Sequence, residues 1–220
     1  MLSHHLTDET LQDYSAGVLN ASMETLIACH LTLCPLCRTR AAMADDLGGV
    51  TLDSQESTPM SASVDDILAL DARIDASHPS NESDAISSEL SKRGVPRPLG
   101  RLLPTPIDEL PWKSFGPGLK QFNLGNQSRK DGAFKLLSLA PGSKMSSHTH
   151  EHRELTFIVS GSYTDEFGHF KSGDVADLSA DHHHTPLVDS SEPCICLVAT
   201  DAPVKFDGFV GKIIQPFVGI

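Results

Sequence analysis

The stretch from Gly142 to Gly161, GSKMSSHTHEHRELTFIVSG, decides the fold of the second half of this 220-residue chain. Two histidines in it lie two residues apart, and a glutamate follows them. Because alternate residues of a strand share one face, His148 and His150 should point to the same side, with Glu154 returning to the same point across a local bend. Imidazole and carboxylate groups bind divalent metals. The stretch therefore predicts a metal site between antiparallel strands.

The spacing of these residues resembles the first motif of the cupin superfamily: Gly142-x5-His148-x-His150-x3-Glu154-x6-Gly161. Further along, Gly173 begins a stretch with the spacing of the second cupin motif, which makes His184 the fourth candidate ligand. Three positions of the second motif depart from the usual Pro, Gly and Asn, namely Ser179, Asp181 and Val188. This puts the loop geometry in doubt but keeps His184, for which His182 is the alternative because it shares the same face in a strand.

Short strands separated by turns are expected throughout residues 112–220. The strand patterns cover 119–124, 133–139, 155–159, 174–178, 185–188 and 194–199, with turn signals such as Asp131-Gly132 and Pro141-Gly142 between them. Strands at this spacing are typical of a sandwich or barrel. The resemblance to cupins implies an antiparallel β-barrel, the double-stranded β-helix.

Residues 1–80 instead have a helical pattern. Thr7 is a candidate N-cap for a first helix, a second helix fits 22–31, a third begins at Pro35 and ends at Gly48-Gly49, and a fourth covers 63–75. Six of the 14 prolines fall in residues 76–111, which indicates a linker. The predicted class is a multidomain α+β chain with a helical domain (1–80), a Pro-rich linker (81–111) and a β domain (112–220).

The helical half carries a second metal motif, His30-x3-Cys34-x2-Cys37. Two cysteines at this spacing can reach one ion from the start of a helix, and thiolates with imidazole favour zinc. A closed tetrahedral site needs a fourth ligand, for which His5 and His4 are the best candidates and Cys29 the competitor. Zinc would also stabilise a bundle too small to rely on its core.

The net charge of −12 lies entirely in the first half, since residues 1–90 contain 15 acidic and 3 basic residues. Such a surface repels phosphate and therefore disfavours direct nucleic-acid binding, while it favours a basic partner or simply keeps the domain soluble. No apolar run approaches the roughly 20 residues of a membrane span, and no signal peptide is recognised. We therefore expect a cytoplasmic protein without a membrane partner.

Residues 30–37 and the short helical domain around them resemble the zinc-binding anti-sigma domain that sequesters extracytoplasmic-function sigma factors. The opening His4-His5-Leu6-Thr7-Asp8, the segment His184-Thr185-Pro186 and the order of the domains extend this resemblance to ChrR-type anti-sigma factors. The resemblance selects His5 over His4, supports His184, and implies zinc in the β domain as well, where geometry alone is compatible with Fe, Mn or Ni. It also implies a 1:1 complex with a sigma factor and singlet oxygen or a related oxidant as the signal.

The resulting hypothesis is a non-enzymatic regulator without catalytic residues, in which the acidic bundle occludes the sigma factor and the cupin senses the signal. The alternative is a metal-dependent cupin enzyme, a dioxygenase or isomerase, with an accessory zinc domain. Cys194 and Cys196 alternate onto one face of a strand and are interpreted as core thiols, with a redox role as the alternative. A dimer through the β domain is left open.

Overall fold

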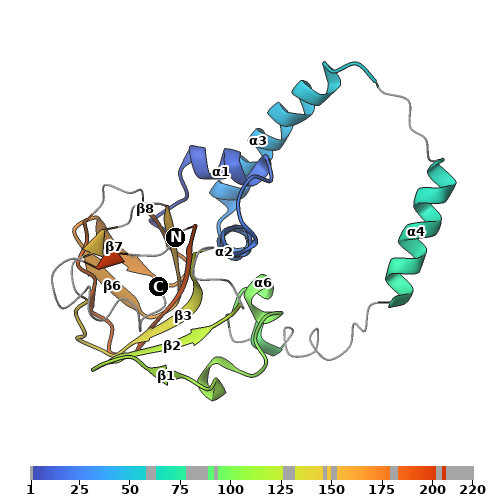
Figure 1. Ribbon diagram of the computed structural model, residues 1–220. Coiled ribbons are helices and arrows are strands. Elements are labelled where there is room, and N and C mark those ends of the chain that lie inside the picture. The colour runs from blue at the N-terminus through green and yellow to red at the C-terminus, as the bar shows by residue number, and fades with distance from the viewer. Residues whose placement is uncertain are drawn as a thin grey trace.

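The computed structural model describes residues 2–57, 63–77, 89–91, 94–125, 132–145, 148–149, 153–178, 183–201 and 205–206. Helices come first and antiparallel strands follow, which confirms the predicted class (Figure 1). The helices are α1 (Asp8–Ser15), α2 (Ala21–Leu33), α3 (Pro35–Asp53), α4 (Val64–Ser77), α6 (Arg97–Gly100) and the 3-10 helix η1 (Ile107–Glu109). Among the described residues, none of these helices is both long and apolar enough to cross a lipid bilayer.

The helix boundaries follow from capping chemistry, with one correction. The Thr7 side chain accepts a hydrogen bond from the Thr10 amide, which confirms Thr7 as the N-cap of α1. The predicted end of the third helix at Gly48-Gly49 is wrong, because α3 continues to Asp53 and is capped at Ser54. Glycine within a helix costs only about 1 kcal/mol relative to alanine, so two exposed glycines do not by themselves end it.

The strands form three antiparallel sheets. The largest has the order β1-β2-β3-β10-β5-β8, a second the order β7-β6-β9, and a third pairs β11 with β4. The strands are β1 (Lys113–Ser114), β2 (Leu119–Asn123), β3 (Phe134–Leu139), β4 (His148–Thr149), β5 (Glu154–Ser160), β6 (Ser162–Asp165), β7 (Gly168–Lys171), β8 (Val175–Leu178), β9 (Leu187–Val188), β10 (Cys194–Thr200) and β11 (Lys205–Phe206). Within the described ranges, these ladders do not close into one continuous barrel.

Strands β3, β10, β5 and β8 of the six-stranded sheet are buried on both faces, whereas β1 and β2 at one edge are exposed or partly exposed. Along β10, Leu197 and Ala199 belong to a core shared with the helices, whereas Cys196 and Val198 belong to a second core with the three-stranded sheet. The same alternation separates Phe157 from Ile158 on β5. Burial on both faces explains why these strands read as almost continuous apolar runs. The helical half is therefore packed directly onto one face of the sheet.

Residues 94–111, within the segment expected to be a linker, also contribute to the shared core. Val95, Leu99, Leu103 and Leu110 are buried there, and α6 packs against α2. The glycines and prolines of this segment correctly predict breaks between long helices and strands, but they do not predict whether the side chains of the segment are buried. The predicted division of the chain at residues 80 and 111 stays a prediction.

Helix α4 differs from the other helices of the first half, since it stands apart from the body of the molecule (Figure 1). Helix α3 contacts both α1 and α2, so these helices form a three-helix unit rather than the expected bundle of four. The apolar side chains Val64, Ile67 and Leu68 of α4 are exposed. Helix α4 thus lacks the cover that normally stabilises an amphipathic helix.

Candidate metal centres and an apolar surface

Four predicted ligands of the helical half come together at the junction of three elements. His5 precedes α1, His30 lies in the last turn of α2, and Cys37 lies in the first turn of α3. Cys34 ends α2 and is also the N-cap of α3, where its sulfur accepts a hydrogen bond from the Cys37 amide at 3.4 Å. Pro35 at the first helical position forces α3 to begin there. The tight turn between α2 and α3 therefore aims both sulfurs at one point.

Three separations between the donor atoms match those of a tetrahedral zinc site. His30 Nε2 lies 3.3 Å from Cys37 Sγ, while His5 Nδ1 lies 3.3 Å from Cys34 Sγ and 3.7 Å from Cys37 Sγ. All four donor atoms lie within 4.8 Å of one another. A tetrahedron with ordinary Zn–S and Zn–N bonds has edges of about 3.3–3.8 Å. The cluster is therefore able to hold a metal ion.

The His30 ring is held from both sides. Its Nδ1–H donates to the Gly173 carbonyl at 2.9 Å, which leaves the lone pair on Nε2 facing the cluster. The ring is fully buried, and burial lowers the pKa of His30 because loss of hydration disfavours the charged imidazolium. His30 is thus kept in the neutral form that binds a metal.

The competing ligands lie elsewhere. The His4 ring stacks on Phe170, with 4.0 Å between ring centroids, and its Nδ1 lies 3.6 Å from a carboxylate oxygen of Asp174. Cys29 is buried outside the cluster, and burial raises the pKa of its thiol to about 12. Burial also raises the pKa of the Cys37 thiol to about 11, so a metal that binds there must displace a proton.

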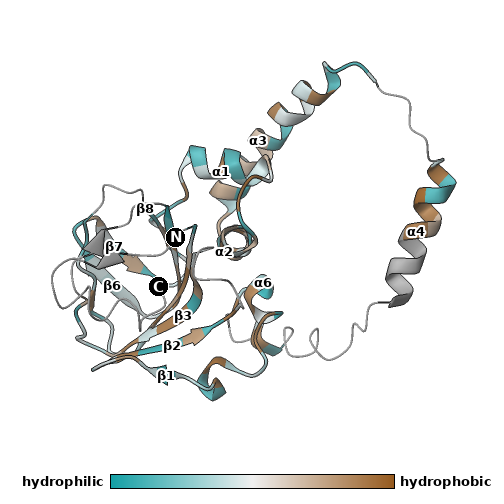
Figure 2. Cartoon of the chain, in the orientation of Figure 1, coloured by the Kyte–Doolittle hydropathy of each residue, from teal (hydrophilic) through white to brown (hydrophobic). Residues whose placement is uncertain are grey.

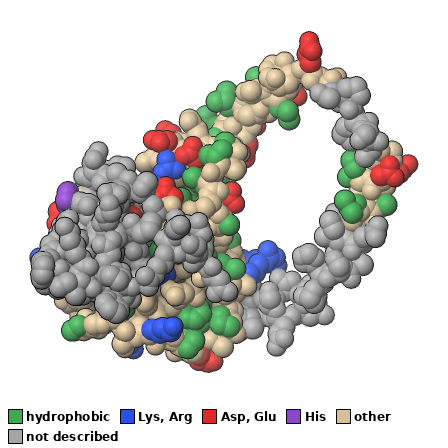
Figure 3. Space-filling view, in the orientation of Figure 1, with side chains coloured by type: hydrophobic (Ala, Val, Ile, Leu, Met, Phe, Trp, Pro, Cys, Tyr) green, Lys and Arg blue, Asp and Glu red, His purple; other side chains and the backbone are tan. Residues whose placement is uncertain are grey.

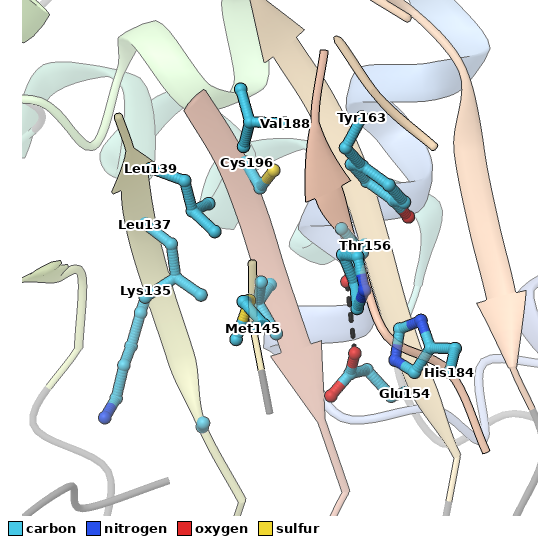
Figure 4. A pocket seen from close by; sticks show the side chains of 13 residues that line it. Lys135, Leu137, Leu139, Met145, Glu154, Thr156, Tyr163, His184, Val188 and Cys196 are labelled. Atoms are coloured by element: carbon cyan, nitrogen blue, oxygen red, sulfur yellow. Dashed lines mark hydrogen bonds between the residues drawn. The ribbon is translucent and has the colours of Figure 1, made fainter. Parts of the chain in front are cut away.

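The second predicted site is described only in part. Glu154 and His184 are both buried and line one pocket of about 50 Å³. His148 lies on β4, but its side chain is not described, and His150 and the alternative His182 lie outside the described residues. Figure 4 shows Glu154, Thr156, Tyr163 and His184 along one side of the pocket, opposite Leu137 and Leu139.

Two side chains hold the candidate ligands Glu154 and His184 in place. Thr156 donates a hydrogen bond to Glu154 at 3.2 Å, and the buried Asp165 carboxylate accepts one from His184 Nδ1 at 3.0 Å. With Nδ1–H bonded to Asp165, the lone pair of the ring lies on Nε2, an arrangement typical of metal-binding histidines. Sequence reasoning missed Asp165, because an aspartate in a turn is interpreted as an ordinary turn former. The structure shows that turn role as well, since the other carboxylate oxygen accepts hydrogen bonds from the Phe167 and Gly168 amides.

The wall of the pocket also carries a thiol and a phenol. Cys194 and Cys196 are buried with their sulfurs 3.6 Å apart, and the hydrogen bond between them, together with burial, raises the pKa of Cys196. The Cys196 thiol therefore stays protonated and is a poor nucleophile. The buried Tyr163 hydroxyl has no hydrogen-bond partner within the described part of the chain. The Glu154 carboxylate and the His184 imidazole, with the Tyr163 hydroxyl beside them, suit a metal ion that has further ligands.

A third feature is an apolar surface on the end of α3 and on α4. Met43, Leu47 and Val50 recur along α3, and Val64, Ile67 and Leu68 along α4, all of them exposed. Figure 2 shows hydrophobic residues on both helices, and Figure 3 shows them interspersed with acidic side chains. Exposed apolar residues that recur along a helix in this way make each helix a candidate protein interaction site.

The chain resembles known proteins along its whole length. A family model described as the ChrR cupin-like domain matches residues 103–203. The anti-sigma-E factor ChrR of Cereibacter sphaeroides is 31% identical over 221 residues, which cover 100% of this chain and 99% of that protein.

Solved structures are also similar to the chain. The crystal structure of Rhodobacter sphaeroides SigE in complex with the anti-sigma ChrR has a TM-score of 0.73 and 28% identity, and it covers 91% of this chain and 100% of the matched chain. KdgF from Halomonas sp. has a TM-score of 0.38 and 17% identity over 43% of this chain and 91% of its own.

Proposed function

Because the chain belongs to the ChrR family of anti-sigma factors, we propose that it sequesters an extracytoplasmic-function sigma factor through its helical half and releases it when the β domain senses an oxidative signal. The observation that carries the proposal is the full-length similarity to an anti-sigma factor whose relative is seen in complex with a sigma factor. It favours a non-enzymatic regulator in the cytoplasm, where sigma factors act.

The apolar surface on α3 and α4 is the part of the chain that we assign to the sigma factor. Covering a leucine-sized side chain removes it from water and contributes about 1.5–3 kcal/mol. Asp45 and Asp46 on α3, and Asp65 and Asp66 on α4, are exposed beside the apolar residues. A sigma factor binds DNA phosphates through basic surfaces, so acidic helices of this kind would compete with the promoter for them.

The metals have distinct roles in this proposal. His5, His30, Cys34 and Cys37 would hold Zn²⁺, which would tie the start of the chain to the junction of α2 and α3 and stabilise the three-helix unit. Glu154 and His184, with His148 and His150, would hold a second divalent metal, for which the family implies zinc. The β domain would then sense the signal, with singlet oxygen as the first candidate.

Co-purification with metal analysis tests the proposal. The full-length chain, expressed with its own tag in cells under no oxidative stress, should bring down one sigma factor in a 1:1 complex with two zinc ions per chain. Addition of the oxidant to the cells before lysis should reduce the captured sigma factor. Iron in the β domain together with oxygen consumption, and no captured sigma factor, would favour the cupin enzyme and refute the anti-sigma function.

A further inference from the structure

The turn between β7 and β8, Ser172–Asp174, belongs to the β domain but contacts the metal cluster of the helical half. Its Gly173 carbonyl accepts the hydrogen bond from His30 Nδ1 at 2.9 Å. Partners of this kind on the outer nitrogen of a metal-binding histidine fix the orientation of the ring and raise its basicity. The β domain therefore supplies part of the environment of a site whose four donors all come from the helical half.

The same turn also positions the segment that carries His5. The Asp174 carboxylate is fully buried and accepts hydrogen bonds from the Ser3 amide at 2.7 Å and the His4 amide at 3.2 Å. These two amides immediately precede His5 in the chain, and Figure 1 shows the start of the chain beside β8. Two of the four donors of the cluster thus depend on one turn of the β domain.

Glycine occupies the centre of this turn. Gly173 has a φ of +92°, and a Cβ atom built on it would lie 2.6 Å from Leu2 Cδ2. The positive φ favours glycine, and any added side chain would also require Leu2 to shift. The docking of the first residues against the turn is therefore tight, and a displacement of the turn would move the start of the chain.

Strand β8 leads from this turn to the second candidate site. The Gly173 amide donates to Ile158 O at 2.8 Å, and the Ile158 amide donates to Asp174 O at 3.0 Å. At the other end of β8, Leu178 pairs with Glu154, which lines the pocket of the β domain. A change at Glu154 and a change at the zinc cluster can therefore both act on the same short strand.

We propose that the turn Ser172–Asp174 is the outer shell of the zinc cluster, and that β8 couples the state of the pocket at Glu154 to zinc retention in the helical half. The proposal deepens the proposed function, on which it rests, because it names the contact through which the β domain acts on the inhibitory half. By thermodynamic linkage the coupling is reciprocal, so loss of zinc also loosens β8.

The decisive measurement is the zinc affinity of the full-length chain, by competition with a chromophoric chelator. Asp174→Ala removes the acceptor of the Ser3 and His4 amides and should weaken zinc binding about tenfold, as for other outer-shell changes. Asp189→Ala is the matched control, since this carboxylate also accepts hydrogen bonds from Ser162 and Thr164 but on the other sheet. It should leave zinc affinity unchanged.

A second variant guards against a folding defect. Asp174→Asn keeps one acceptor oxygen and should shift zinc affinity in the same direction by less than Asp174→Ala. Cobalt substitution adds a readout of geometry, because the visible bands of Co²⁺ in the cluster should change in Asp174→Ala and stay as in the wild type for Asp189→Ala. Wild-type affinity and wild-type cobalt bands in both Asp174 variants would overturn the proposal.

Hydrogen exchange tests the coupling along β8. Removal of zinc from the wild-type chain should accelerate exchange at the Gly173 and Ile158 amides, while the amides between β2 and β3 should keep their protection. Unchanged exchange at Gly173 and Ile158 would refute the coupling. Sigma-factor capture by the same wild-type preparation separates this inference from the proposed function. If the sigma factor is captured but exchange on β8 is unchanged, only this inference is overturned. If no sigma factor is captured, the proposed function is overturned.

Discussion

Helices α2 and α4 are both rich in apolar residues, yet only α2 is covered by the rest of the chain. Leu26 and Ile27 of α2 are completely buried against the sheet and α6, whereas Val64 and Leu68 of α4 are more than half exposed. The outer half of α3 resembles α4, with Leu47 at 63% exposure. An apolar helix that the chain itself does not cover is either costly or kept for a partner. The contrast separates residues that hold the fold from residues available for recognition.

The largest effect on the covered helices should come from removal of the zinc ligands that hold them together. Cys34→Ala or Cys37→Ala should abolish zinc binding by the cluster and unfold the helical half, since structural zinc sites contribute about 10–16 kcal/mol of binding free energy. Zinc content and circular dichroism of the full-length chain provide the measurement. Retention of helical structure and sigma-factor binding by a zinc-free double variant would contradict it.

A core truncation in α2 should affect stability next. Leu26→Ala leaves a cavity between α2 and its neighbours and should lower the free energy of unfolding by about 2–5 kcal/mol. Chemical denaturation of the zinc-bound chain measures this change. Leu47→Ala is the matched control on exposed surface and should change stability by less than about 0.5 kcal/mol.

In partner binding, Leu47→Ala should have a larger effect than Leu26→Ala, the reverse of their effects on stability. Leu47→Ala removes a side chain that we assign to the sigma factor and should weaken the complex by about 1–2 kcal/mol, roughly tenfold. Titration of the purified sigma factor with the folded variant measures this loss. Equal affinities of Leu47→Ala and the wild type, repeated for Leu68→Ala, would place the interface elsewhere.

The zinc affinity of the cluster should depend on pH. The pKa of the Cys37 thiol is raised to about 11, so over the neutral range the free site holds a proton that zinc must displace. Zinc affinity should therefore rise with pH and fall about tenfold for each pH unit below neutrality, from this one proton. Chelator competition at several pH values tests the sign, and an affinity independent of pH would refute proton displacement at Cys37.

Sequence reasoning performed best where the signal is local. The spacing of His30, Cys34 and Cys37 follows from one helix end and the next helix start, and the cluster assembles as that spacing predicts. It failed at the end of α3, where two glycines were read as a stop, and it missed Asp165, which reads as a turn residue. The metal site predicted in the β domain remains a prediction for all four of its ligands, although Glu154 and His184 line one pocket.

The sequence by itself determined the order of helices and strands, the two candidate metal motifs and the uneven charge, because periodicity, capping and ligand spacing act over a few residues. Only the tertiary structure decided that the helical half packs on the sheet, that Gly173 holds His30, and that Asp174 holds the start of the chain. His30 and Gly173 are 143 residues apart, and Ser3 and Asp174 are 171 apart. Contacts between such distant residues leave no periodic trace in a single sequence, since they depend on how completed elements meet.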